Sequence, residues 1–127
     1  MATYLLDTNI LIDILRDRQG RRALALALLD QDHLLATCPI NVAELYAGMR
    51  PKEEPATTTL VESLRLLPIS GQAARQAGLF KRGYAAKGVT LSLPDALIAA
   101  VAIEHGCTLV TENRKDFPMP ELSLYPL

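Results

Sequence analysis

The sequence has no apolar run that approaches the roughly 20 residues needed to span a bilayer. It also lacks a basic segment ahead of the apolar residues near its start, which argues against a secretory signal peptide. Cysteine is scarce, and because Cys38 and Cys107 do not form a CxxC pair, we expect reduced core residues rather than a disulfide or a zinc site. These absences predict a cytoplasmic protein without a membrane segment.

An excess of positive charge is absent too, because the formal net charge is −1. Proteins that bind nucleic acid normally use Lys and Arg to contact phosphate. However, if a bound cation neutralised the four acids singled out below, removing four negative charges from −1 would leave +3. Basic pairs are then available to face phosphate, although a solvated helix surface explains any one of them equally well: Arg16/Arg18, Arg21/Arg22, Lys81/Arg82 and Arg114/Lys115.

The order of sequence patterns predicts an α/β fold. A chain of 127 residues, half of them apolar, suits a single domain over residues 1–127 that buries about two-thirds of its unfolded surface. Apolar, β-branched stretches predict strands at 3–7, 33–37, 66–69, 108–111 and 122–125, and helical spacing predicts helices at 9–16, 22–29, 40–49, 53–66, 72–87 and from 94 to about 105, with a mobile loop at 51–55. This alternation favours a central, mainly parallel sheet of four or five strands with helices on both faces.

Asp7 stands where the first predicted strand ends and a helix begins. The carboxyl ends of parallel strands share one edge of the sheet, and α/β proteins hold their ligands at that edge. Thr8 and Asn9 follow directly, so three polar groups occupy the turn into the helix. A helix N-cap explains one such residue but does not need all three, which favours a functional role and leaves capping open.

Glu44 lies on the outward side of a predicted helix whose apolar residues form a stripe on the other side. We expect the neighbouring residues on its side, Asn41, Ala47 and Gly48, to be small enough for a substrate to approach. The ordinary alternative for such a residue is a solvated Glu with no role.

Asp95 and Asp116 complete the set of candidate acids. Asp95 directly precedes the apolar run 96–103, where a carboxylate needs either the helix N-terminus, capped by Ser92 or by Asp95 itself, or an adjacent divalent ion. Asp116 lies in the polar loop after the strand at 108–111, where an ordinary turn residue is the alternative. In the same loop, Asn113 could orient a carboxylate or hold a metal-bound water, and Glu112 is a weaker candidate for the same roles.

Converging carboxylates repel one another, by about 4 kcal/mol per pair at about 4 Å and an effective dielectric constant of about 20. A cluster of them therefore implies a compensating cation. Oxygen ligands favour Mg²⁺ or Mn²⁺ over zinc, which prefers His and Cys. We predict a nuclease in which Asp7, Asp95 and Asp116 hold one or two such ions, and in which Glu44 ligates the metal or orients the attacking water.

Four segments carry a resemblance to a known family: LLDTNILID at 5–13, NVAELYAGM at 41–49, LPDALIAAVAIEHG at 93–106 and LVTENRKDF at 109–117. In order and spacing they resemble the PIN-domain family, in particular the VapC-type toxins of toxin–antitoxin pairs, over nearly the whole chain. The resemblance implies a three-layer α/β/α fold and a metal-dependent endoribonuclease. Its catalytic positions match Asp7, Glu44, Asp95 and Asp116, and its supporting positions match Thr8, Asn9 and Asn113.

The resemblance also implies partners that the residues alone do not indicate. These are an RNA substrate, with transfer RNA preferred, a small VapB-type antitoxin that blocks the metal site, and a second copy of the chain in a homodimer. Nothing in the sequence identifies the RNA sequence that would be cut.

Two other classes of function are compatible with parts of the sequence. An Asp that ends the first strand can be a phosphorylated nucleophile, but haloacid-dehalogenase-type phosphatases use a second acid two residues later, where this chain has Asn9. Response regulators pair acids before their phosphoacceptor, a pattern that is also absent. The other alternative is a catalytically inactive scaffold of the same fold that binds RNA or protein.

Overall fold

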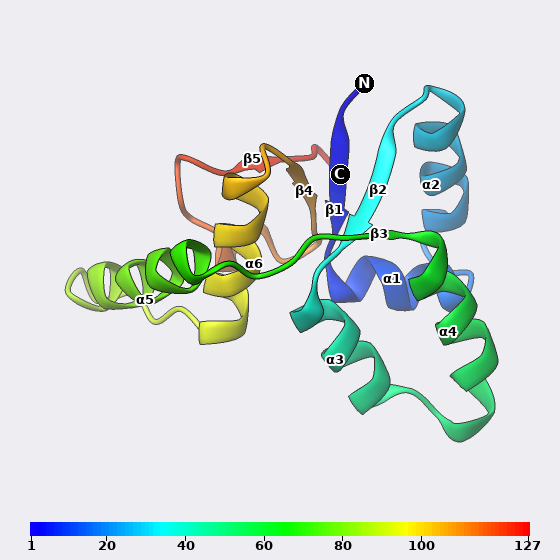
Figure 1. Cartoon of the computed structure of the whole chain (residues 1–127), viewed down its shortest axis with the longest axis horizontal. Coiled ribbons are helices and arrows are strands. Elements are labelled where there is room, and N and C mark those ends of the chain that lie inside the picture. Colours follow the sequence, from blue (N-terminus) through cyan, green and yellow to red (C-terminus); the bar gives the residue numbers. More distant parts are fainter.

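The molecule is built on a five-stranded sheet with helices on both sides (Figure 1). The structure is a computed structural model and describes residues 1–127. All neighbouring strands are parallel, in the order β3-β2-β1-β4-β5. Their bounds are β1 Thr3–Leu6, β2 Leu34–Thr37, β3 Arg65–Leu66, β4 Thr108–Val110 and β5 Ser123–Leu124. The predicted α/β fold with a parallel sheet of four or five strands is confirmed.

Each face of the sheet has its own apolar core, because successive side chains of a strand point to opposite faces. Leu5 of β1 belongs to the core formed with α5 (Gly71–Ala85) and α6 (Leu93–Glu104). Its neighbour Leu6 belongs to the core formed with α1 (Thr8–Leu15), α2 (Arg21–Asp30) and, through Leu45, α3 (Pro39–Gly48). Two residues in succession thus hold helices on opposite sides, which produces the three layers.

The helix predicted to be the most buried, α6, is buried nearly all round. Its residues 98–102 are no more than 2% exposed. Cys38 and Cys107 are free and buried in the α5–α6 core, as predicted. No helix combines the length and the apolar character that crossing a lipid bilayer requires.

The middle of the chain differs from the prediction. The helix expected at 53–66 ends earlier, as α4 (Glu54–Ser63), because the backbone of Leu64 is extended. The strand expected at 66–69 is shorter and begins one residue earlier, as β3, because Arg65 pairs with β2. The segment expected to be a mobile loop forms a 3₁₀ turn, η1 (Pro51–Glu53), and the start of α4. The carboxylate of Glu53 accepts hydrogen bonds from the Arg50 amide at 2.7 Å and from Arg16 Nε at 3.3 Å, which fasten this segment to α1.

The strand order places a topological switch point at the carboxyl ends of β1 and β4. From β1 the chain builds β2 and β3 on one side, and then returns to build β4 and β5 on the other. At such a switch point the connections leave in opposite directions and open a space beyond the strand ends. Figure 1 shows α1 and α3 leaving the same edge of the sheet, where the candidate acids lie.

Candidate active site

Asp7 lies at the switch point, where hydrogen bonds to the start of α1 and to the end of β4 hold it. Its amide donates to the Val110 carbonyl of β4 at 2.9 Å, which continues the pairing of the strands. Its Oδ1 accepts the Thr8 amide at 2.8 Å, and its Oδ2 accepts the Thr111 hydroxyl at 2.7 Å. The residue is both the N-cap of α1 and a buried carboxylate, 5% exposed, so capping and a functional role are compatible.

The surroundings of Asp7 disfavour its charge. Burial raises the pKa of this carboxyl above its ordinary value, and the hydrogen bonds from Thr111 and Thr8 offset only part of that effect. The nearby carboxylates of Asp95 and Glu44 raise the pKa further. No positive charge of the protein acts in the opposite direction, so the site favours either a proton or an external cation.

Glu44 projects from α3 and is exposed, as the sequence predicted. Its Oε1 accepts the hydroxyl of Thr8 at 2.7 Å, which links α3 to the start of α1. Asn41, expected to be a small residue beside the substrate, is instead completely buried and donates to the same hydroxyl at 3.1 Å. The expectation was wrong because the side chain of Asn41 turns inward to Cys38 and Thr8, whereas Glu44, Ala47 and Gly48 are exposed.

Asp95 lies in the first turn of α6 but does not cap it. Ser92 is the N-cap, since its hydroxyl accepts the Asp95 amide at 3.1 Å. The half-buried carboxyl of Asp95 has a raised pKa, mainly because of desolvation; an interaction with Ser92 lowers it, and the acids Asp116 and Glu44 raise it. Ser92 is thus the cap, and the negative charge of Asp95 in the first turn also suits the N-terminus of α6.

Asp116 follows β4 in a short 3₁₀ turn, η2 (Arg114–Asp116), and its amide donates to the Asn113 carbonyl at 2.9 Å. The Asn113 amide donates to the hydroxyl of Thr111 at 3.0 Å, and that hydroxyl in turn donates to Asp7. Glu112 of the same loop is paired with Arg21, with 2.6 Å between Oε1 and Nη2. Nothing in its contacts supports the weaker role predicted for Glu112 at the site.

Electrostatic repulsion connects all four candidate acids. Asp7 is affected by Asp95 and Glu44, and Asp95 is affected by Glu44 and Asp116. No Lys, Arg or His nitrogen lies within 4.0 Å of any of these carboxylates. The structure thus brings together residues that are up to 109 positions apart, as the numbers 7 and 116 show, and leaves their charges without a partner.

The chemistry of this group fits a hard divalent cation, for which carboxylate and amide oxygens are the preferred ligands. The amide oxygen of Asn9, in the first turn of α1, is buried and accepts no hydrogen bond. As the side chains stand, no three His, Cys, Asp or Glu residues are close enough to hold a metal ion. Asp7, Asp95 and Asp116 therefore stay predicted ligands, and their carboxylates would have to lie closer together to share one ion.

Sequence reasoning missed Thr111 and misjudged Asn41. Thr111 ends β4, so the rule that singled out Asp7 applies to it as well, once β4 is known to lie beside β1. Asn41 stands in the first turn of a helix, three residues before Glu44, and residues with this spacing are neighbours on a helix. The spacing was therefore the available signal that Asn41 lies close to the acid site.

Comparisons with known proteins agree with the geometry. The model of the PIN domain matches residues 4–119. Ribonuclease VapC10 of Mycobacterium tuberculosis is 36% identical over 117 residues, which cover 92% of this chain and 87% of that protein. The crystal structure of VapBC2 from Rickettsia felis bound to a DNA fragment from their promoter has a TM-score of 0.85, 27% identity and 97% coverage of both chains. A toxin–antitoxin complex from Klebsiella pneumoniae has a TM-score of 0.77 and 30% identity, with 98% of this chain and 99% of that chain covered.

Proposed function

Because the chain belongs to the PIN domain family, as its four motifs predicted, we propose that it is a metal-dependent endoribonuclease and the toxin of a type II toxin–antitoxin pair. Its relative VapC10 is named a ribonuclease. The observation that carries the proposal is the group of four acids at the carboxyl edge of the sheet with no cation of the protein beside it. In the alternative, a scaffold that only binds, the same acids would be relics or recognition groups.

In this proposal Asp7, Asp95 and Asp116 hold Mg²⁺ or Mn²⁺, which when bound supplies charge neutralisation and a Lewis acid for phosphate oxygens. Glu44 orients the attacking water. Its Oε1 is engaged by Thr8, which leaves Oε2 to take a proton as the water oxygen bonds to phosphorus. The bond between phosphorus and the leaving ribose oxygen breaks in the same displacement, and that oxygen takes a proton from solvent water.

The supporting residues act on the acids rather than on the substrate. Thr8 donates its amide to Asp7 and its hydroxyl to Glu44, and so fixes two of the four acids. Asn113 is tied to Asp7 through the hydroxyl of Thr111. Asn9 contributes an amide oxygen that has no hydrogen bond of its own.

The direct test is cleavage of end-labelled RNA by the purified protein in EDTA and after addition of excess Mg²⁺. We expect no cleavage in EDTA and recovery with Mg²⁺. Cleavage that persists in EDTA would contradict the role of the metal. RNA binding without cleavage in either Mg²⁺ or Mn²⁺ would favour the inactive scaffold instead.

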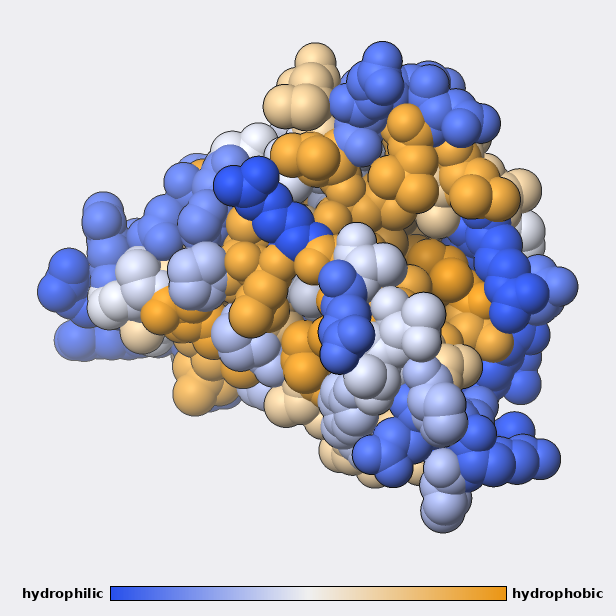
Figure 2. Space-filling model, turned by 45° about the vertical axis from the view of Figure 1, so that its right-hand side comes forward, coloured by the Kyte–Doolittle hydropathy of each residue, from blue (hydrophilic) through white to orange (hydrophobic).

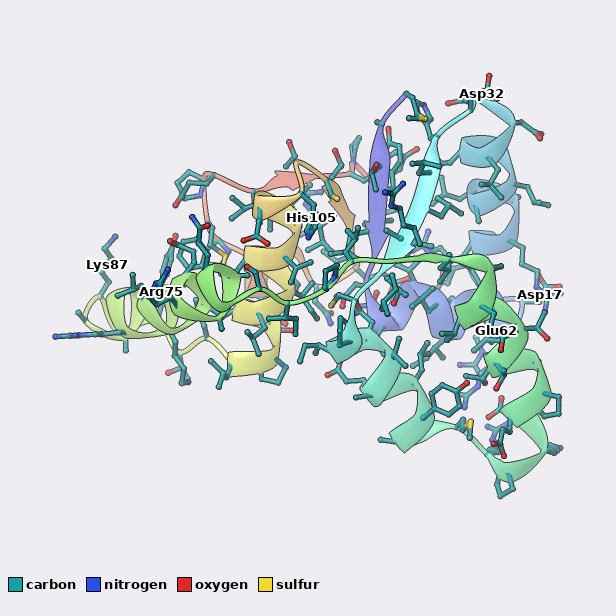
Figure 3. All side chains as sticks on the ribbon, viewed as in Figure 1. Asp17, Asp32, Glu62, Arg75, Lys87 and His105 are labelled. Atoms are coloured by element: carbon teal, nitrogen blue, oxygen red, sulfur yellow. The ribbon has the colours of Figure 1, made fainter.

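We further propose that RNA approaches over α5 and the loop that follows it. Residues 71–92 carry no acid and four basic side chains: Arg75, Lys81, Arg82 and Lys87. Figure 3 shows Arg75 and Lys87 at the end of the molecule opposite to Asp17 and Glu62. This basic segment leads directly into α6, whose first turn contains Asp95. Phosphate would therefore be attracted to a surface next to the acids.

Transfer RNA is the first substrate to test, and mapping of RNA ends after brief expression in cells would report the target. Substitution of Arg75 and Arg82 by Glu should weaken RNA binding and reduce its dependence on salt concentration. An unchanged salt dependence would place the RNA elsewhere.

A second surface suits the antitoxin. A groove of about 620 Å³ lies between α1, α2, α4 and β2, and nine of its twelve lining residues are hydrophobic. Two of them, Leu26 and Leu29, are 61% and 48% exposed, and Figure 2 shows a broad apolar area on the side of the molecule that carries these helices. Apolar surface of this extent usually marks an interface. Because the similar structures include a toxin–antitoxin complex, we propose that an apolar segment of a VapB-type antitoxin fills the groove.

Co-expression with the small product of a neighbouring gene tests this assignment. Substitution of Leu26 by Lys should reduce co-purification by at least about tenfold, because a charge would be buried in the interface. Leu79 is 57% exposed on α5, outside the groove, so Leu79→Lys is the matched control and should have no effect. Equal effects of the two substitutions would contradict the groove. A homodimer remains a prediction, which the molar mass in solution tests.

A further inference from the structure

Asn41 is a completely buried polar residue at the carboxyl edge of the sheet, in the first turn of α3. Its side-chain oxygen accepts the Cys38 amide at 3.3 Å and the Cys38 thiol at 3.1 Å. Its side-chain nitrogen donates to the Thr8 hydroxyl at 3.1 Å. Buried amides need such partners, but these particular partners connect the residue to the acid site.

The direction of each hydrogen bond in this chain follows from what each group can do. A backbone amide can only donate, so the Cys38 amide fixes which end of the Asn41 side chain is the oxygen. The nitrogen end must then face Thr8, where it can only donate. The Thr8 hydroxyl therefore uses a lone pair for Asn41, and its single proton is directed to Glu44 Oε1 at 2.7 Å.

The position of Glu44 depends on that proton. Its exposed side chain makes no other hydrogen bond, and Thr8 holds Asp7 at the same time through its amide. If the Thr8 hydroxyl rotated away, Glu44 would lose its only tether and would be repelled by Asp7. Burial keeps Asn41 in one orientation. Asn41 thereby orients the Thr8 hydroxyl, and that hydroxyl holds the exposed carboxylate of Glu44.

We propose that Asn41 is a positioning residue of the acid site, which orients the Thr8 hydroxyl so that Glu44 stays beside Asp7. The proposal rests on the proposed nuclease function for its catalytic consequence. It predicts that Asn41 acts only through Thr8. Partners that orient residues at metal sites typically contribute about 10- to 100-fold in metal affinity or activity.

A double-mutant cycle tests this dependence, with Asn41→Leu, Thr8→Val and the double variant. Asn41→Leu should lower kcat for RNA cleavage about tenfold with KM within about twofold, but should cost less than about twofold in the Thr8→Val background. An equal loss in both backgrounds, or no loss with Thr8 present, would overturn the proposal. Thr57→Val is the matched control, because Thr57 is also fully buried and its hydroxyl donates to the Glu53 carbonyl and not to any residue of the acid site.

A second measurement separates this inference from the nuclease proposal. Titration of the same four proteins with Mn²⁺, followed by electron paramagnetic resonance, should show weaker binding for Asn41→Leu only when Thr8 is present, because a released Glu44 no longer adds its negative charge beside the ion that Asp7 holds. If the wild type bound Mn²⁺ but cut no RNA, the proposed function would fail while this cycle still tested Asn41. If Asn41→Leu does not fold, Asn41→Ala replaces it, since the smaller Ala fits the same space and cannot donate to Thr8.

Discussion

Two clusters of acidic residues in this molecule differ in whether a basic residue of the protein compensates their negative charge. Beside α1 and α2, Asp13 and Glu112 face the guanidinium of Arg21, at 4.0 Å from Asp13 and 2.6 Å from Glu112. At the carboxyl edge of the sheet, the four candidate site residues repel one another electrostatically, and no cation of the protein pairs with them.

The difference shows in the pKa values. The hydrogen bond from Arg21 lowers the pKa of Glu112, which therefore keeps its charge, and Asp13, desolvated and hydrogen-bonded to Glu112, has a raised pKa. At the carboxyl edge the pKa values of Asp7 and Asp95 are both raised. The group with its own arginine is compensated within the protein, whereas the group at the carboxyl edge is not, which is what the proposed metal site requires.

The largest expected effect comes from neutralising one acid in each group. Asp7→Asn should reduce RNA cleavage at least about 100-fold, equivalent to about 2.7 kcal/mol of activation free energy, because a ligand charge is lost while the size of the side chain is kept. Asp13→Asn, the matched change in the other group, should leave cleavage within about threefold. Initial rates with labelled RNA and Mg²⁺ measure both, and equal losses would show that the two groups do not differ in role.

Removal of the arginine should destabilise the fold. Arg21→Met leaves Asp13 and Glu112 facing each other, and we expect a loss of about 2 kcal/mol in the free energy of unfolding, less than the roughly 3–5 kcal/mol of a fully buried pair, because Glu112 is 35% exposed. Arg22→Met is the control on the same helix: Arg22 is 53% exposed, and its loss should cost less than about 1 kcal/mol. Urea unfolding measures both; a stable Arg21→Met protein would mean that Arg21 does not compensate this group.

A divalent ion should stabilise the uncompensated group. At ten times its dissociation constant, Mg²⁺ should increase the free energy of unfolding by about 1.4 kcal/mol, because it binds the folded state. The increase should vanish in Asp7→Asn and persist in Asp13→Asn. Thermal unfolding with and without Mg²⁺ provides the measurement, and an equal gain in Asp7→Asn would place the ion elsewhere.

The smallest expected effect is a difference in pH dependence without metal. A raised pKa means that the folded state binds protons more tightly, so the stability contributed by Asp7 and Asp95 is full below the ordinary pKa of an Asp and is lost as pH rises through their folded values. Glu112 has a lowered pKa, so its contribution is present above the ordinary pKa of a Glu and is lost as pH falls. The measurement is urea unfolding at several pH values in EDTA. Asp7→Asn should reduce the loss of stability as pH rises, and Arg21→Met should reduce the loss of stability as pH falls. If neither loss changed, these groups would not control the pH dependence.

The sequence predicted the candidate acids through local patterns. Asp7 was found because an apolar strand stops at it, and Asp95 because an apolar helix begins just after it. The contacts that hold these acids were not predictable in the same way. Thr111 lies 104 residues from Asp7, and Thr8 lies 36 residues from Glu44, so each hydrogen bond depends on which elements become neighbours.

Taken by itself, the sequence determined the alternation of strands and helices, the burial of α6 and the placing of acids at strand ends, because periods of 2 and 3.6 residues record which side of an element is buried. Only the tertiary structure decided that β1 lies between β2 and β4, that Asn41 turns inward, and that Arg21 reaches Glu112 rather than the acids at the carboxyl edge. These outcomes depend on packing between distant segments, since charge is compensated by whichever group lies next to it in space, and no local pattern encodes that neighbour.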